Sequence, residues 1–310
     1  MDKTTRSMQR AMRLLLALLL AGAIYLGLAV YAAAIFTVAP RTFDPNNNPA
    51  KFGLDFREVR VPSRTPGLEL AGWYIPNPGS TRALVMVHGH TSSRSSEFGG
   101  GLGELAAALH QRGFAVLAID LRGHGTSDAA PIGFGTVEHD DVAGALDWLR
   151  AEGFAADHLG VFGVSMGGAA SIRALADDPE VAALVIDGTP AVIQEVVQRQ
   201  WTRNLRLPEF FLSTTLFVAR ARYGIDLEAN AALETMRRLG PRPVLIIHGL
   251  DDALILPDHA ERLAAALPSA ELWLIPGSGH AQNFATERER YLARVADFFD
   301  QHVPAQSPRR

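Results

Sequence analysis

A G-x-S-x-G pentapeptide at residues 163–167 constrains the fold of this chain more than any other feature. The apolar run 159–164 leads into it, as a buried parallel strand would, and small, helix-compatible residues follow it. A serine between such a strand and helix is held in a tight turn with its hydroxyl exposed, and glycines flank it where side chains would collide. The residue types are common, so the rest of the chain must supply partners for Ser165.

Strand-like and helix-like segments alternate from residue 83 onward, after two segments that alternate well enough for an antiparallel pair. This pattern predicts an α/β fold: a mostly parallel eight-stranded sheet with helices on both faces. The expected strands are 56–61, 68–74, 83–87, 115–120, 159–164, 183–187, 243–248 and 271–275, and the expected helices include 101–112, 137–152, 166–178, 258–267 and 285–302.

Two late strands end in residues that could activate a serine hydroxyl. A hydroxyl is a poor nucleophile unless a base takes its proton and a third group orients that base. Asp251 and Asp252 follow the strand 243–248, and His280 follows the strand 271–275. Because carboxyl ends of neighbouring parallel strands meet at one sheet edge, we expect a carboxylate and an imidazole side by side, facing Ser165.

The loop after the strand 83–87 is the expected second half of an oxyanion hole. Gly89 lets the backbone approach a substrate carbonyl, and His90 would supply one main-chain N–H. Met166, at the start of the helix after Ser165, would supply the other. His88 and His90 are spaced as a metal pair could be, but no third ligand is evident nearby, so we expect no metal.

Four sequence blocks resemble the α/β-hydrolase superfamily of serine hydrolases: residues 88–93, 120–127, 163–167, and 248–252 with 277–280. The match covers roughly residues 52 to 302 and is closest to membrane-anchored bacterial esterases and acyl-protein thioesterase-like hydrolases. It implies a Ser165–Asp252–His280 triad, an oxyanion hole from the N–H groups of His90 and Met166, and no cofactor.

The acid position departs from the family pattern H-G-x-x-D-x-x-V-P. Aligning the first two residues of the pattern places the aspartate at Asp252 and Ile255 at the valine position. Leu256 stands where proline is usual, and Pro257 comes one residue later. Asp251 therefore stays open as an alternative acid.

The resemblance implies hydrolysis of a carboxylic ester or thioester through an acyl-enzyme. A serine peptidase, an acyltransferase and a cofactor-free haloperoxidase share the same triad and remain alternatives. A non-catalytic binding module would be expected to lack one triad member, and all three candidates are present. The chain has no cysteine, which excludes disulfides, a cysteine nucleophile and thiolate metal sites.

Residues 190–240 interrupt the alternation with two helix-like segments, 191–201 and 208–223. An insertion after the sixth strand emerges above the carboxyl ends of the sheet, where ligands bind in such folds. We expect a small helical lid whose apolar residues, including Phe211 and Phe217, bind the acyl part of the substrate.

The N-terminal region has the composition of a membrane anchor. Residues 14–39 carry no Asp, Glu, Lys, Arg or His, which exceeds the roughly 20 residues needed to cross a bilayer. Four basic residues precede this stretch, so the positive-inside rule predicts a cytoplasmic N-terminus and an extracytoplasmic catalytic domain. A cleaved signal peptide, giving a secreted protein, is the alternative.

The expected organisation follows from these features. It comprises a cytoplasmic basic N-terminus (1–13), a transmembrane signal anchor (14–39), a linker (40–50), an α/β-hydrolase domain (51–303) containing the lid insertion (190–240), and a disordered tail (304–310). The formal net charge of −4 argues against nucleic-acid binding. The expected partners are a small-molecule or lipid-like ester and the membrane; the oligomeric state stays open.

Overall fold

A single mixed sheet forms the centre of the protein, whose computed structural model describes residues 3–201, 203, 208–227 and 232–305. The strand order is β1-β2-β4-β3-β5-β6-β7-β8. β1 and β2 are antiparallel, as are β2 and β4, and all other neighbours are parallel. The predicted fold class is confirmed. The strands are β1 Arg57–Pro62, β2 Glu69–Ile75, β3 Arg82–Val87, β4 Phe114–Ile119, β5 Leu159–Val164, β6 Ala183–Asp187, β7 Val244–Gly249 and β8 Glu271–Ile275.

The central strands are apolar throughout because both faces of the sheet are covered. In β3, Val85 and Val87 join the hydrophobic cluster on one face, whereas Leu84 and Met86 join the cluster on the other. All four side chains are fully buried. The twofold side-chain period of a strand therefore divides one continuous apolar run between two cores.

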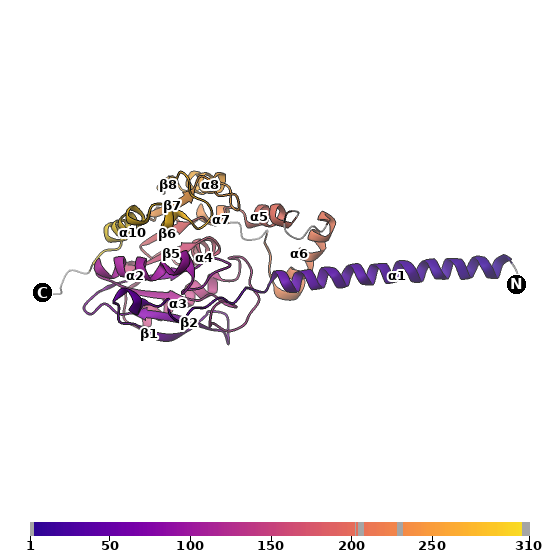
Figure 1. The fold of residues 1–310 in the computed structure, drawn as a ribbon, viewed down its shortest axis with the longest axis horizontal. Helices are drawn as coiled ribbons and strands as arrows, with labels where there is room; N and C mark the ends of the chain where they lie inside the picture. The colour runs from indigo at the N-terminus through magenta and orange to yellow at the C-terminus, as the bar shows by residue number, and fades with distance from the viewer. Residues whose placement is uncertain (1–2, 202, 204–207, 228–231, 306–310) are drawn as a thin grey trace.

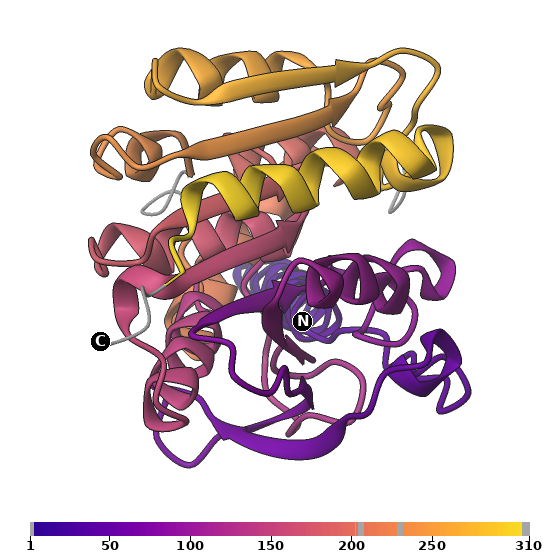
Figure 2. The same ribbon diagram turned by 90° about the vertical axis from the view of Figure 1, so that its left-hand side faces the viewer.

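Helices cover both faces of the sheet (Figures 1 and 2). α2 (Leu102–Gln111) and α10 (Arg288–His302) pack on one face, while α3 (His139–Ala151), α4 (Met166–Ala176) and α8 (Asp258–Ala266) pack on the other. The shorter helices are η1 Pro49–Phe52, η2 Glu97–Gly100, η3 Ala156–His158, α7 Ala232–Met236 and α9 Asn283–Thr286.

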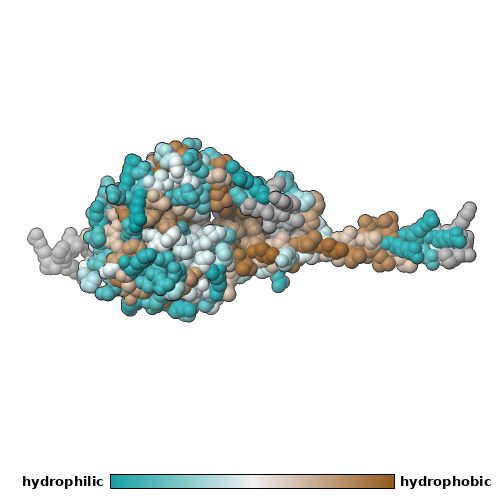
Figure 3. Space-filling view, in the orientation of Figure 1, coloured by the Kyte–Doolittle hydropathy of each residue, from teal (hydrophilic) through white to brown (hydrophobic). Residues whose placement is uncertain are grey.

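The insertion between β6 and β7 contains α5 (Ile193–Gln200), α6 (Glu209–Tyr223) and the short α7. Figure 1 shows α6 beside the end of α1 (Lys3–Phe36), and α1 projects from the domain as one long helix. Within the described chain, Thr4–Phe36 is the one helix long and apolar enough to cross a membrane, and only 6% of its most apolar window is buried. Figure 3 shows the apolar surface of α1 reaching the α/β domain, with hydrophilic residues near its free end.

The segment after α1 is fastened to the domain along its length. The Thr37 carbonyl accepts the N–H of Ile132 at 2.9 Å. The Arg41 guanidinium donates to the Gly123 and Ser127 carbonyls, and the N–H of Asp44 donates to Ser95 Oγ at 2.9 Å. The expected linker thus runs irregularly but packs against the domain. In the expected tail, residues 306–310 lie outside the described residues.

Candidate active site

The turn between β5 and α4 holds Ser165 in an unusual backbone conformation. Its φ is 51° and its ψ is −114°, and its N–H donates to the Asp187 carbonyl at 2.7 Å. A Cβ at Gly163 would lie 2.7 Å from the Gly167 carbonyl oxygen, and one at Gly167 would lie 2.4 Å from the His88 carbonyl oxygen. The glycines of the pentapeptide are therefore required for the turn to close against its neighbours.

The structure brings Ser165, His280 and Asp252 into one hydrogen-bonded row. His280 Nε2 lies 3.1 Å from Ser165 Oγ, and His280 Nδ1 lies 2.7 Å from Asp252 Oδ2. A carboxylate can only accept a hydrogen bond, so the neutral His280 ring carries its proton on Nδ1, facing Asp252. The lone pair of Nε2 then faces the Ser165 hydroxyl.

Asp252 is fixed by its own turn. Its Oδ1 accepts the N–H groups of Leu254 at 2.9 Å and Ile255 at 2.8 Å, and the residue is 2% exposed. Asp251 is exposed, and its backbone N–H donates to the Ser278 carbonyl at 2.9 Å. The geometry therefore places Asp252, and not Asp251, beside the imidazole.

The charge environment of His280 favours its protonated form. Burial acts to lower the pKa of His280, but the hydrogen bond and charge of Asp252 outweigh it, assisted by the charges of Asp187 and Glu97. The net result is a pKa above the ordinary 6.5. A proton taken from Ser165 would consequently be held on a stabilised imidazolium.

Buried side chains hold the loop that follows β3 beside Ser165. A Cβ on Gly89 would lie 3.4 Å from Ser165 Cβ, so the Gly89 backbone lies directly beside the Ser165 side chain. His88 accepts the N–H of Leu121 at Nε2 and donates from Nδ1 to the Gly89 carbonyl at 2.7 Å. His124 Nε2 donates to the His90 carbonyl at 2.6 Å. His88 and His124 therefore position the loop.

Two buried carboxyl groups beside Ser165, His280 and Asp252 were not predicted from the sequence. Glu97 accepts the Gly89 N–H at 2.7 Å, and burial raises its pKa. Asp187 accepts from Asn283 Nδ2 at 2.6 Å and the Tyr291 hydroxyl at 2.7 Å, and burial raises its pKa to about 6. The available signals were weak: Glu97 is the only acidic residue between residues 88 and 103, and Asp187 ends an apolar strand.

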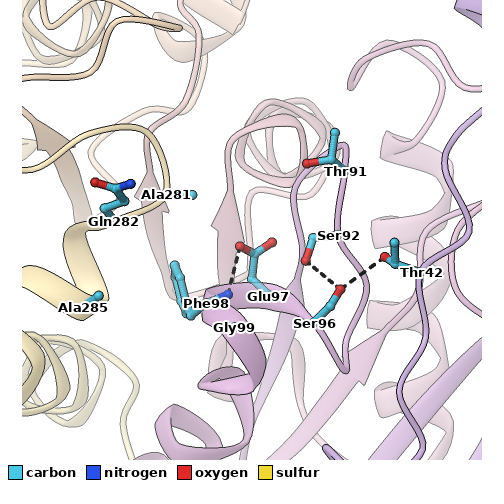
Figure 4. A pocket seen from close by; sticks show the side chains of 10 residues that line it. All are labelled: Thr42, Thr91, Ser92, Ser96, Glu97, Phe98, Gly99, Ala281, Gln282 and Ala285. Atoms are coloured by element: carbon cyan, nitrogen blue, oxygen red, sulfur yellow. Dashed lines mark hydrogen bonds between the residues drawn. The ribbon is translucent and has the colours of Figure 1, made fainter.

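A pocket of about 320 Å³ lies between this loop and the segment after His280 (Figure 4). Figure 4 shows Glu97 at its centre, with hydroxyl side chains on one side and Gln282 on the other. Its lining residues are Thr42, Thr91, Ser92, Ser96, Glu97, Phe98, Gly99, Ala281, Gln282 and Ala285. The pocket is thus rich in polar groups close to the candidate triad.

Backbone strain gathers around the site. Among the described residues, four that are not glycine have a left-handed φ: Phe98 (55°), Phe134 (55°), Ser165 (51°) and Ala281 (56°). Phe98 and Ala281 line the pocket, and the Phe134 ring stacks on His90 with centroids 4.9 Å apart. Such conformations persist where the surrounding structure enforces them, and they cluster at functional sites.

The structure does not bring the two lid phenylalanines to Ser165. Phe211 packs on Tyr25 of α1, with ring centroids 4.7 Å apart, and Phe217 is 70% exposed. Phe217 lines a separate pocket of about 260 Å³ between α5 and α6. Their role in binding an acyl group therefore stays a prediction.

The two residues expected to donate to the oxyanion lie next to Ser165 and next to Gly89 in the chain. Met166 is the first residue of α4, directly after Ser165, and His90 follows the Gly89 backbone that approaches the serine. Within the described chain, no group of three or more His, Cys, Asp or Glu side chains is arranged to hold a metal ion. The site offers a base, a hydroxyl and backbone N–H groups for chemistry.

Comparison with known proteins agrees with the observed fold. The structure is similar to that of the esterase Pf2001 of Pyrococcus furiosus, with a TM-score of 0.71 and 25% identity, covering 86% of this chain and all of that one. The sequence is 26% identical to 2-(acetamidomethylene)succinate hydrolase of Mesorhizobium japonicum, covering 73% of this chain and 91% of that protein. It is also 25% identical to the uncharacterized protein YfhR of Escherichia coli K12, covering 75% of this chain and 76% of the relative.

The family model described as "Alpha/beta hydrolase family" matches residues 84–298. This range begins in β3, includes the serine turn and His280, and ends in α10. It accounts for well over half of the chain. The protein therefore belongs to the alpha/beta hydrolase family.

Proposed function

We propose that this hydrolase cleaves a carboxylic ester or a thioester through an acyl-enzyme formed on Ser165. The observation that carries the proposal is the continuous hydrogen-bonded row from Asp252 through His280 to Ser165, with links of 2.7 and 3.1 Å. A row of this kind is what turns a weakly nucleophilic hydroxyl into an attacking group. The similarity to an esterase supports the ester class of substrate.

In the first half-reaction, Ser165 Oγ attacks the substrate carbonyl carbon while its proton passes to His280 Nε2. The carbonyl oxygen takes up the electron pair and becomes an oxyanion, which the N–H groups of His90 and Met166 stabilise. The oxyanion then collapses and the carbon–oxygen or carbon–sulfur bond breaks. His280 returns its proton to the leaving alcohol or thiol, and the acyl group remains on Ser165.

In the second half-reaction, water takes the place of the leaving group. His280 Nε2 accepts a proton from the water as its oxygen attacks the acyl carbon. Collapse of the second oxyanion releases the carboxylic acid, and His280 protonates Ser165 Oγ. Throughout, Asp252 holds the imidazole in the required tautomer and stabilises its positive charge.

The test is the substitution Ser165→Ala in the full chain. Turnover of a chromogenic ester should fall by several orders of magnitude, with an unchanged melting temperature, because only the covalent route is lost. A fluorophosphonate probe should label the wild-type chain at Ser165 and leave the variant unlabelled. Ser269→Ala, at an exposed serine outside the site, is the matched control and should leave both measurements unchanged. Near wild-type turnover in the Ser165 variant would refute the proposal.

We also propose that α1 spans the membrane with its N-terminus in the cytoplasm. Arg6, Arg10 and Arg13 precede the charge-free stretch, which supports this orientation through the positive-inside rule. A reporter that is active only outside the cytoplasm, fused after Arg310, should be active. A silent fusion would reverse the orientation, and recovery of a soluble chain shortened by about 20 to 34 residues would indicate cleavage instead.

A further inference from the structure

Helix α6 of the insertion packs directly on α1. The Tyr25 hydroxyl donates to the Phe210 carbonyl at 3.1 Å and hydrogen-bonds Thr214 Oγ1. The ring of Tyr25 also packs on Phe211, with centroids 4.7 Å apart. Further along the same face of α1, Ala29 is fully buried. The outer half of α1 therefore has a protein-facing side made largely by α6.

The depth of Tyr25 in a bilayer follows from the position of the basic residues. The hydrocarbon layer takes about 20 helical residues to cross. If the hydrocarbon layer begins at Leu14, it ends near Ala33. At a rise of 1.5 Å per residue, Tyr25 then lies about 12 Å inside the boundary near Ala33. Moving Tyr25 out of the layer would draw three arginines into it, and charged groups there carry a large penalty. The contact with α6 therefore lies at or below the membrane surface.

The outward face of α6 suits this location. Phe210 is 61% exposed and Phe217 is 70% exposed, and the exposed Ser213 lies between them on the same face. Ser213 and Phe217 also border the pocket between α5 and α6. Residues 210–219 carry no charged side chain. Two large aromatic side chains exposed on one uncharged helix face indicate a surface that water does not ordinarily cover.

The charged residues at both ends of α6 limit how deep it can lie. Glu209 precedes the uncharged stretch, and Arg220 follows it; both are exposed. Charged groups need the headgroup region, whereas apolar side chains of an interfacial helix reach about 5–10 Å into the boundary with the acyl chains. The helix therefore lies in the outer part of the layer, with its charged side chains extended to the headgroups, and does not cross the layer.

We propose that α6 is a membrane-binding helix whose partner is the lipid leaflet on the side of the catalytic domain. Phe210 and Phe217 insert among the acyl chains, while Glu209 and Arg220 stay with the headgroups. This inference rests on the proposal that α1 crosses the bilayer. It gives the exposed phenylalanines a lipid contact, independent of which ester the site cleaves.

The absence of cysteine makes the test direct, because a single introduced cysteine gives one labelling site. We would attach an environment-sensitive fluorophore to Ser213→Cys and Phe217→Cys variants of the full chain in phosphatidylcholine–phosphatidylglycerol vesicles. Ser213→Cys changes only one atom, which protects the fold. The matched control is Ser269→Cys, an exposed serine next to β8, and Leu19→Cys in α1 reports on the anchor. Quenching by nitroxide-labelled lipids and by aqueous iodide would be measured for each.

The expected result is strong lipid quenching and weak iodide quenching at positions 213 and 217, with the reverse at 269. If positions 213 and 217 behave like 269 while position 19 is quenched by lipid, the inference about α6 is wrong and the anchor stands. If position 19 is also quenched by iodide, both the anchor and the inference fail. Neither reading depends on catalysis, so failure of the proposed ester hydrolysis would be seen separately.

Discussion

Asp252→Asn should inactivate the enzyme by reversing the direction of one hydrogen bond. In the native turn, Asp252 Oδ1 accepts two backbone N–H groups, at 2.9 and 2.8 Å, and Oδ2 faces His280. An asparagine would keep its oxygen on these two N–H groups. The opposite orientation would place the amide NH2 against both N–H groups, and each unsatisfied donor would cost about 1–3 kcal/mol. With its oxygen kept there, the asparagine would face His280 Nδ1 with its NH2 group.

That arrangement forces the wrong tautomer on the imidazole. With a donor opposite Nδ1, the ring proton moves to Nε2, which would then donate to Ser165 Oγ and could not take its proton. The same change in another serine triad lowers kcat by about 10⁴. A loss of that size corresponds to about 5.4 kcal/mol of transition-state stabilisation, at 1.36 kcal/mol per factor of ten.

The assay is turnover of a soluble chromogenic ester by the full chain in detergent, together with the rate of fluorophosphonate labelling. Both rates should fall together, since both need the activated hydroxyl. Asp251→Asn is the matched control: the same chemical change one residue earlier, at an exposed side chain, should cost less than a factor of two or three. A loss under tenfold for Asp252→Asn, or a larger loss for Asp251→Asn, would refute the reasoning.

Other predictions concern pH dependence and stability. Because His280 must be neutral to act as a base and its pKa is raised, kcat/KM should fall as pH decreases, with a midpoint above 6.5; a midpoint below that value would contradict the raised pKa. Arg94→Met should lower the unfolding free energy by about 3–5 kcal/mol, since it leaves Asp120 buried without its partner. Glu152→Gln, which breaks an exposed pair with Arg57, should change it by less than about 1 kcal/mol in the same urea titration.

Features set by local pattern could be predicted from the sequence. The strands that place Ser165 and His280 are short apolar runs bounded by turn residues, and the glycines around Ser165 report a backbone that tolerates no side chain there. Asp252 was harder, because the two neighbouring aspartates differ only once the turn is folded: Asp252 is buried and accepts two backbone N–H groups, whereas Asp251 is exposed. That difference depends on the folded turn and has no separate signal in the sequence.

Features that depend on distant contacts could not be predicted. Glu97 is buried because its loop folds back onto Gly89, which no periodicity reveals. The direction faced by Phe211 is set by its contact with Tyr25 of α1. Tyr25 also hydrogen-bonds the carbonyl of Phe210, which lies 185 residues later in the chain. An apolar helix can be recognised from its composition, but the neighbour that it packs against is decided by the whole fold.

The contact between α1 and the domain restricts where the chain could be cut to release the domain from the proposed anchor. The ring of Phe36 packs on Phe134 with centroids 4.5 Å apart, and Phe134 in turn stacks on His90. A peptidase cutting among the small residues 32–34 would cut through a face on which Ala33 is fully buried and would uncover the apolar cluster around Trp201. The released fragment would expose a hydrophobic patch beside the loop that follows β3, so truncated forms made for solubility should tend to self-associate. In this protein the end of α1 packs as part of the domain to which it is joined.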